Sequence, residues 1–213
     1  MTMTSEIIRS AANPELEIIA YSGHFATRHS HNTHYLDITR MKHEFTMARE
    51  AAITLAQCYA SDKKVDTIVC LDGSEVIGAF LARHLSKDDR LSVNQNKNIN
   101  VVTPEYDSNG QFIFRENLCS MIAGKDVLIL ISTVNSGKTA RRAVECVRYY
   151  GGRPRCIAAV FSKMGLVAGT PVYSLFTPMD VPGYATHSYK DCPMCAAGQK
   201  IDALANSYGF AKL

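Results

Sequence analysis

Long apolar runs and blocks of like charge are both missing from this chain of 213 residues. A membrane-spanning helix needs about 20 consecutive apolar residues, and no run approaches that length. The formal net charge is +3, and basic residues gather only in pairs such as Lys63-Lys64 and Arg141-Arg142. The sequence therefore predicts no membrane contact and no nucleic-acid partner, which leaves anionic small molecules as candidate ligands. The first residues lack the basic start and apolar stretch of a signal peptide, so we expect a cytoplasmic protein.

A second cysteine pair is also lacking. Cys192 and Cys195 have the Cys-x-x-Cys spacing of zinc and redox sites, but no further pair completes a four-sulfur site. The alternatives for this pair are a metal or redox site and a structural turn, and we favour the turn. The other five cysteines lie in apolar or amphipathic segments and are expected to be free, buried thiols: Cys58, Cys70, Cys119, Cys146 and Cys156.

The order of the apolar segments indicates an α/β fold. With 46% hydrophobic and 20% charged residues, the chain can bury one good core, and we expect a single domain over residues 1–213. In chain order we expect a helix over 43–59, a strand over 65–71, a helix over 76–85, strands over 99–103 and 127–131, a helix over 137–150, and strands over 155–161 and 172–176. This alternation predicts a mostly parallel sheet with helices on both faces and ligands at the carboxyl ends of its strands.

The remaining segments give weaker patterns. We expect a short helix over 4–12, short strands and loops over 17–40, and a helix near 199–206. Asp107-Ser108-Asn109-Gly110 is a strong turn sequence and predicts a hairpin.

Residues 127–139 form the best candidate for a ligand site. An apolar, β-branched run ends in small polar residues, and a helix then opens at Lys138. Backbone N–H groups in such a turn, together with the positive end of the helix dipole, favour a bound phosphate. No Asp or Glu occurs between Asp126 and Glu145, so the loop has no carboxylate to hold a metal or a sugar hydroxyl. Lys138 either contacts the phosphate or is an exposed lysine of the first turn, and both alternatives stay open.

A P-loop of a nucleotidase is an alternative explanation of Gly137-Lys138-Thr139. The first glycine of that motif would fall on residue 132, which is Ser, and no convincing strand-ending Asp is left for the metal. The P-loop is therefore the weaker hypothesis.

The loop resembles that of the type I phosphoribosyltransferases, and of the orotate phosphoribosyltransferases in particular. In that family two acidic residues end a buried strand, an apolar pair follows, and a Thr-Thr-Gly-Lys/Gly-Thr/Ser loop binds the 5′-phosphate of phosphoribosyl diphosphate (PRPP). In this chain the two acidic positions fall on Ile131 and Ser132. The resemblance implies a 5′-phosphate site made of Thr133, Val134, Asn135, Ser136, Gly137, Lys138 and Thr139.

Three further segments extend the resemblance. Asp72, Gly73 and Ser74 resemble the diphosphate-binding turn, although Asp72 fits a helix-capping turn equally well. The Cys-Pro-Met-Cys segment resembles the Cys-Pro-Leu-Cys tail of many orotate enzymes. Residues 23–35 resemble the hood segment, which assigns to the hood Phe25, Arg28, Thr33 and Tyr35.

The resemblance also implies an architecture. It places a type I phosphoribosyltransferase-like core at about 43–170, with a small hood from about 15–40 and 171–213, and it implies a homodimer. Four histidines in or near the hood could instead suggest a metal site. We favour substrate or surface roles and predict no metal ligand among His24, His29, His31 and His34.

Two features depart from an active transferase. Ile131 cannot bind ribose hydroxyls or metal-bound diphosphate, and Ser132 offers only a neutral hydrogen bond. The expected mobile catalytic loop is acidic, with Glu105, Asp107 and Glu116 against Arg115 alone. We therefore predict an orotate phosphoribosyltransferase-like protein that binds PRPP or a nucleotide by its 5′-phosphate, with Mg²⁺ as cofactor only if it transfers phosphoribosyl to a pyrimidine-type base. The alternative is a non-catalytic, nucleotide-sensing or regulatory protein of the same fold.

Overall fold

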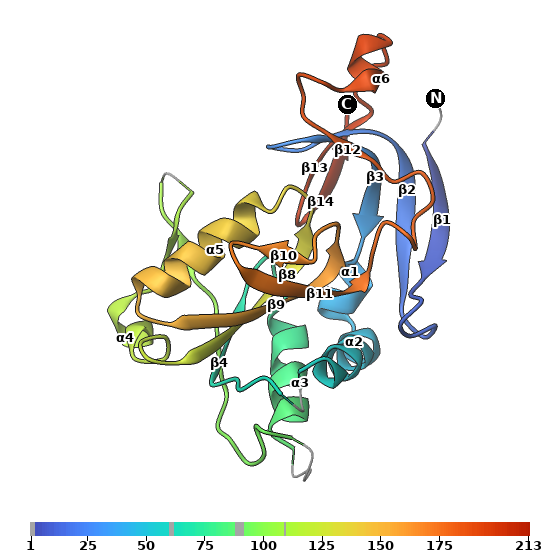
Figure 1. The fold of residues 1–213 in the computed structure, drawn as a ribbon. Coiled ribbons are helices and arrows are strands. Elements are labelled where there is room, and N and C mark those ends of the chain that lie inside the picture. The colour runs from blue at the N-terminus through green and yellow to red at the C-terminus, as the bar shows by residue number, and fades with distance from the viewer. Residues whose placement is uncertain (1–2, 60–61, 88–91, 109) are drawn as a thin grey trace.

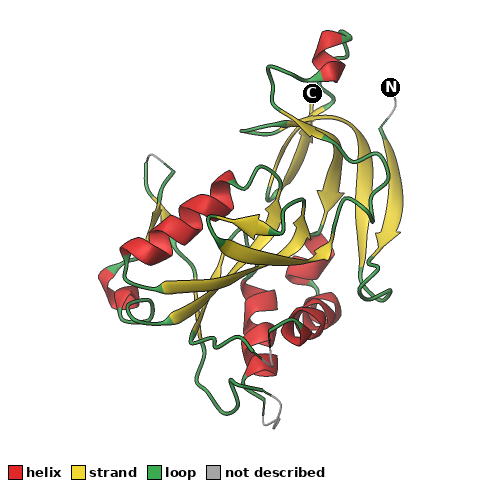
Figure 2. Cartoon of the chain, viewed as in Figure 1, coloured by secondary structure: helices red, strands yellow, loops and turns green. Residues whose placement is uncertain are grey.

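The computed structural model of the chain describes residues 3–59, 62–87, 92–108 and 110–213 (Figures 1 and 2). Within them, the strands form two six-stranded sheets and a two-stranded hairpin. One sheet and most of the helices make up the body of the molecule. The other sheet, which we call the hood, stands at the upper right of Figure 1 and carries both ends of the chain.

The body is built on a sheet of strand order β10-β11-β9-β8-β4-β5, in which all neighbours are parallel except β10 and β11. Its strands are β4 (Thr67–Cys70), β5 (Asn100–Val102), β8 (Asp126–Val134), β9 (Arg153–Ser162), β10 (Leu166–Val167) and β11 (Thr170–Phe176). Its helices are α1 (Thr39–His43), α2 (Phe45–Gln57), α3 (Glu75–Leu85), α4 (Glu116–Cys119) and α5 (Lys138–Tyr149). The predicted α/β class with a mostly parallel sheet is confirmed.

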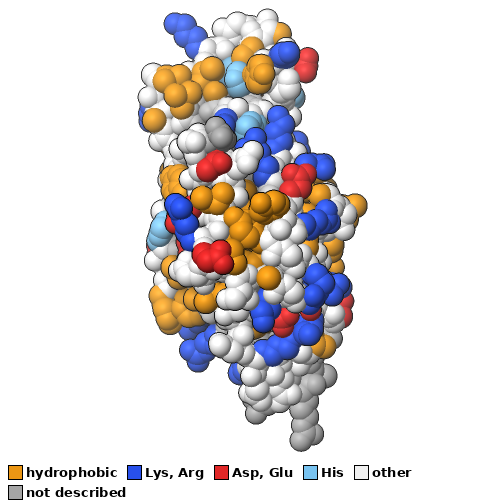
Figure 3. Space-filling view, turned by 90° about the vertical axis from the view of Figure 1, so that its left-hand side faces the viewer, with side chains coloured by type: hydrophobic (Ala, Val, Ile, Leu, Met, Phe, Trp, Pro, Cys, Tyr) orange, Lys and Arg blue, Asp and Glu red, His pale blue; other side chains and the backbone are white. Residues whose placement is uncertain are grey.

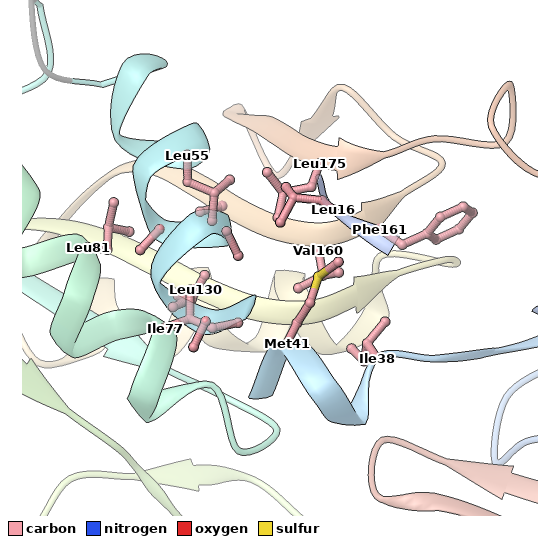
Figure 4. Close-up of a cluster of buried hydrophobic side chains, with 14 of the residues drawn as sticks. Leu16, Ile38, Met41, Leu55, Ile77, Leu81, Leu130, Val160, Phe161 and Leu175 are labelled. Atoms are coloured by element: carbon pink, nitrogen blue, oxygen red, sulfur yellow. The ribbon is translucent and has the colours of Figure 1, made fainter. Parts of the chain in front are cut away.

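Side chains of β8 alternate between two apolar layers, as the two-residue period of a strand requires. Leu128 and Leu130 pack in the layer that contains the buried side chains of α2 and α3, which Figure 4 shows. Val127, Ile129 and Ile131 pack in the layer under α5. Helices therefore cover both faces of the sheet, and β8 is buried on both sides.

The hood sheet has the strand order β12-β3-β2-β13-β14, and β1 pairs with the first part of β2. Leu16 and Ile18 belong to the same buried cluster as α2 and α3, so the hood packs against the body. The hood elements are β1 (Thr4–Arg9), β2 (Glu17–Ala26), β3 (His31–Asp37), β12 (Thr186–His187), α6 (Pro193–Ala196), β13 (Ala203–Asn206) and β14 (Gly209–Lys212). Of the segments expected to form the hood, β11 lies in the body sheet instead.

Two helix predictions are wrong. Residues 4–12 contain strand β1, which runs antiparallel to β2. Residues 199–206 contain strand β13, which pairs with the far end of β2 through Ala203 and Phe25. In both segments, pairing with β2 overrides the local preference for a helix.

The predicted hairpin is confirmed by β6 (Glu105–Tyr106) and β7 (Phe112–Ile113), which pair antiparallel. Of its predicted turn, Asn109 lies outside the described residues.

The surface mixes charges of both signs. On the face seen in Figure 3, Lys and Arg side chains are interspersed with Asp and Glu. Among the helices of the described residues, none has the length and apolar character needed to span a bilayer.

Candidate functional site

A pocket of about 340 Å³ is lined by residues of both the body and the hood. All seven residues of the predicted phosphate loop, 133–139, contribute to its wall. Arg28 and Tyr35 join them from the hood, and Asp72 joins them from the turn after β4. The pocket therefore lies at the carboxyl ends of β4 and β8, where parallel sheets place their ligands.

One buried side chain and one glycine shape the phosphate loop. Val134 packs in the apolar layer under α5, and its carbonyl oxygen accepts a hydrogen bond from the Lys163 N–H at 2.9 Å. Gly137 directly precedes α5 with φ +71°, and a Cβ atom there would lie 2.9 Å from Met164 Sδ. Only glycine adopts this backbone conformation and fits this space without strain, so Gly137 fixes the direction of the loop as it enters the helix.

The amino-terminal end of α5 borders the pocket. Lys138, Thr139 and Arg142 from its first turns line the wall, and the first turn contains no acidic residue. The positive end of the helix dipole and its free N–H groups therefore add to the positive charge of the side chains. This combination favours an anionic group such as a phosphate.

Basic side chains from the hood and the body converge on the same space. Arg28, His29, Lys138 and Arg142 all line the pocket. The pKa of His29 is lowered first by burial and then by repulsion from the positive charges of Lys138, Arg28 and Arg142. An anion bound among them would relieve that repulsion.

Asp72 is the one carboxylate among the described residues that line the pocket. Burial raises its pKa, while a hydrogen bond with Ser207 and the charge of Lys42 oppose that change. Lys42 is itself buried, and its ammonium donates to the Ser207 carbonyl oxygen at 2.8 Å. The other two residues of the predicted diphosphate turn, Gly73 and Ser74, lie outside the lining, and the Ser74 hydroxyl donates to a backbone carbonyl of β8.

The two positions that are acidic in the type I phosphoribosyltransferases differ in their surroundings here. Ile131 is buried in the apolar layer under α5 and takes no part in the lining. Ser132 lines the pocket, and its hydroxyl donates to the Asp72 carbonyl oxygen at 3.3 Å. The end of β8 is therefore joined to the neighbouring turn by a neutral hydrogen bond, and it presents no carboxylate to a ligand.

Two predicted hood residues lie outside the pocket. The Phe25 ring is buried near the rings of Tyr35 and Phe210, with centroids 5.9 and 5.7 Å away. The Thr33 hydroxyl accepts a hydrogen bond from the Ala185 N–H at 2.8 Å. Both side chains stabilise the hood, and neither faces the ligand space.

The sequence alone does not reveal several of the lining residues. Tyr184 donates its hydroxyl to Asn135 Oδ1 at 2.7 Å and so ties the segment before β12 to the phosphate loop. Nothing in its sequence context marks it. Arg142 could have been found, because it follows Lys138 by four residues and so lies on the same face of the helix.

The fold is that of the type I phosphoribosyltransferases. An orotate phosphoribosyltransferase from Mycobacterium tuberculosis H37Rv is similar with a TM-score of 0.50 and 16% identity, over 70% of this chain and 83% of that one. A phosphoribosyltransferase from Corynebacterium diphtheriae gives 0.51 and 16%, over 75% and 90% of the two chains. An adenine phosphoribosyltransferase from Trypanosoma brucei gives 0.50 and 12%, over 71% and 73%. These likenesses bear on the fold alone.

Similarity in sequence is confined to a short segment, and no family model matches the chain. The transcriptional regulator GfcR of Methanosphaerula palustris is 35% identical over 60 residues, which are 27% of this chain and 29% of that protein. The GfcR protein of Haloferax volcanii is 34% identical over 64 residues, or 29% and 30% of the two chains. The chain thus matches less than a third of the length of these curated relatives.

Proposed function

We propose that this protein binds PRPP or a nucleotide by its 5′-phosphate, in the pocket formed by residues 133–139 and the hood. The observation that carries the proposal is one cavity in which a glycine-directed loop and a helix amino terminus meet Arg28, Lys138 and Arg142. Charge-assisted hydrogen bonds from such groups contribute about 1.5–3 kcal/mol each.

We further propose that binding in this pocket serves sensing or regulation. A transferase must hold the ribose hydroxyls while the bond to C1 breaks, and the positions suited to that task are Ile131, which is buried, and Ser132, which bonds to a backbone oxygen. The short sequence match to two transcriptional regulators supports the same proposal.

Transfer of phosphoribosyl to a pyrimidine-type base is the second candidate. It draws support from the fold, since structures of that orotate phosphoribosyltransferase include a complex with PRPP. The experiment below separates the two.

The pocket does not fit a protein-held Mg²⁺. Asp72, the one carboxylate among the described lining residues, is already engaged by Ser207 and Lys42. Mg²⁺ prefers several oxygen ligands and commonly arrives with substrate phosphates. We therefore propose that binding does not require Mg²⁺.

Isothermal titration calorimetry with and without Mg²⁺ tests binding. PRPP, ribose 5-phosphate and uridine 5′-monophosphate should bind, and uridine should not. The double substitution Lys138→Ala with Ser136→Ala should weaken binding by at least about tenfold, while unchanged affinity would show that the phosphate-loop assignment is wrong.

Release of diphosphate from PRPP, Mg²⁺ and a panel of bases tests catalysis. We expect none above the rate without protein. Release with orotate or another base would favour the transferase over the sensor. A homodimer and a cytoplasmic location remain predictions, of which the first is checked by light scattering on the purified protein.

A further inference from the structure

Four metal-binding side chains from distant parts of the chain meet in the hood, outside the pocket. His24 lies in β2, His31 begins β3, and Cys192 and Cys195 lie at α6, at the top of Figure 1. Their ligand atoms all lie within 4.8 Å of one another. We propose that these four residues bind a zinc ion. The sequence favours a structural turn for the cysteine pair and no metal ligand, whereas the geometry points to a metal site.

Four of the distances between the ligand atoms are close to those of a tetrahedral zinc site. Zn–N bonds of about 2.0–2.1 Å and Zn–S bonds of about 2.3 Å place two nitrogens about 3.3 Å apart and a nitrogen and a sulfur about 3.6 Å apart. Here His24 Nε2 lies 3.0 Å from His31 Nδ1 and 3.6 Å from each of the two sulfurs. Cys195 Sγ lies 3.2 Å from His31 Nδ1. Since all the ligand atoms lie within 4.8 Å of one another, small side-chain adjustments would bring the set to the geometry of a bound ion.

The surroundings of His24 select the tautomer that a metal needs. Its Nδ1 lies 3.1 Å from the Gln199 carbonyl oxygen and 3.2 Å from that of Lys200. Carbonyl oxygens only accept, so Nδ1 carries the proton and donates it. The lone pair of Nε2 is then directed at the other three residues. A backbone carbonyl bonded to the far nitrogen is the usual way in which a metal-binding imidazole is oriented.

An irregularity in β2 directs His24 toward the cluster. The register between β2 and β3 shifts between Ser22 and Phe25, which is the effect of a β-bulge. Asp202 Oδ2 accepts the His24 N–H at 2.7 Å, and a Cβ atom on Gly23 would lie 3.0 Å from that oxygen. A glycine and a carboxylate therefore maintain the bulge, and the bulge turns the imidazole out of the regular strand pattern.

The cysteine pair lies on a tight turn that brings both thiols to the imidazoles. The Ala196 N–H donates to the Cys192 carbonyl oxygen at 3.0 Å, and the Gly198 N–H donates to that of Cys195 at 2.9 Å. Both cysteines are free thiols, Cys192 buried and Cys195 exposed. Two thiolates would neutralise a divalent ion, and a tetrahedral set of two sulfurs and two nitrogens is typical of zinc.

Four protein ligands leave no open position on the metal, so the site is structural. His24 and His31 bracket the turn at residues 27–30, which lines the pocket and carries Arg28. The ion would join this turn to the segment around α6. The metal would therefore hold the hood in shape beside the pocket without entering it.

Metal content of tag-free protein tests the proposal without reference to any ligand of the pocket. Protein is produced with added zinc, kept reduced and then dialysed. Inductively coupled plasma mass spectrometry should then find one zinc ion per chain. Cys195→Ser and His31→Asn should each retain at least tenfold less zinc. The predicted burial of Cys58 is wrong, because its side chain is exposed. Cys58→Ser is the matched control, because Cys58 is an exposed free thiol like Cys195 but lies outside the cluster, and this variant should retain the full amount of zinc.

Cobalt provides a second measurement on the folded wild-type chain. Tetrahedral Co²⁺ bound by thiolates should give charge-transfer and visible d–d absorption, and zinc should displace it. Reduced wild-type protein that binds neither metal would overturn the proposal. So would a Cys192–Cys195 disulfide found in the native protein, or full zinc retention by Cys195→Ser.

Discussion

At the scale of single residues, two adjacent arginines differ in whether they line the pocket. Arg142 lines the pocket, whereas Arg141, the next residue on the same helix, lies outside the lining, and both side chains are exposed. A helix advances by about 100° per residue, so adjacent side chains point in different directions. The pair offers a comparison at nearly constant net charge and helix propensity.

Arg142→Ala should weaken the binding of a 5′-phosphorylated ligand by about ten- to a hundredfold, the loss expected for one charge-assisted contact. Arg141→Ala should change it by less than about threefold, because an exposed charge outside the pocket acts only through screened, long-range attraction. Calorimetry at constant salt measures both. Equal losses in the two variants would mean that only the general positive field matters.

Gly137→Ala should lower the free energy of unfolding and abolish phosphate binding. Alanine at φ +71° costs about 1–2 kcal/mol, and its Cβ would lie 2.9 Å from Met164 Sδ. Gly124→Ala is the matched control, because φ there is +70° and nothing lies within 4 Å of the added atom. Urea denaturation should show the larger loss for Gly137→Ala, and calorimetry should show normal ligand binding for Gly124→Ala alone.

At the scale of elements, β8 has a charged residue at its start and borders the pocket at its end. Asp126 at its first position has a side chain 3% exposed and accepts hydrogen bonds from Arg153 at 2.8 Å and from Arg155 at 2.7 Å, both on the adjacent strand β9. The hydrogen bond from Arg153 is the main cause that lowers the pKa of Asp126, and burial opposes it. These bonds fix the pairing of β8 with β9 at the end of the sheet opposite the pocket.

Because the pKa of Asp126 is lower in the folded state, its contribution to stability is complete above the unfolded value and is lost as the pH falls through the folded value. Asp126→Asn should therefore lower the free energy of unfolding by about 1–2 kcal/mol at pH 7 and flatten its decline below about pH 5. Urea denaturation at several pH values measures both effects.

The matched control is Glu105→Gln. Glu105 pairs with Arg115 at 2.7 Å, but both side chains are more than half exposed. Solvent screens an exposed pair, so it contributes little to stability, and the change should be smaller than that of Asp126→Asn at pH 7. A larger loss from Glu105→Gln would contradict the role given to burial.

Periodicity in the sequence predicts those helices and strands whose own apolar residues form a regular pattern. The apolar runs of β8 and β9 and the three- and four-residue spacing of α2 and α5 each indicate their own structure. Strand β1 escapes prediction because five of its six side chains are exposed and its pairing with β2 alone defines it. Strand β13 escapes because Ala and Leu favour a helix locally, and pairing with the neighbouring strands β2 and β14 decides otherwise.

In the candidate site, too, the sequence predicts the contiguous residues but not those that come from distant segments. The loop 133–139 is contiguous, and sequence spacing is enough to find it. The position of Asp72 directly after a strand indicates a place in the site, but the sequence does not indicate its partners Lys42 and Ser207, because they come from distant segments. In the proposed metal cluster, the Cys-x-x-Cys spacing is visible in the sequence, but nothing there joins Cys192 to His24, which lies 168 residues away.

At the scale of the whole molecule, the pocket depends on the packing of the hood against the body. Arg28 and Tyr35 come from the hood sheet, and the phosphate loop comes from the body sheet. Leu16 and Ile18 bury the base of the hood in the main apolar cluster of the body. A ligand that contacts both parts should therefore stabilise them together.

A 5′-phosphorylated ligand at a hundred times its dissociation constant should raise the free energy of unfolding by about 2.7 kcal/mol. For a chain of this length that corresponds to about 5–10 °C in the melting temperature. Differential scanning calorimetry should show one transition that shifts as a whole, and uridine should leave it in place. Two transitions of which only one shifts would contradict joint stabilisation of hood and body.

The contact of Lys42 with Ser207 has a consequence for synthesis of the chain. Residues 205–207 form part of the pocket wall, and Lys42 and Asp72 both engage Ser207. The phosphate loop leaves the ribosome well before this segment does. A partly synthesised chain can thus form the loop but not the closed pocket, so the proposed ligand would bind only to molecules in which residues 205–207 have already packed against Asp72.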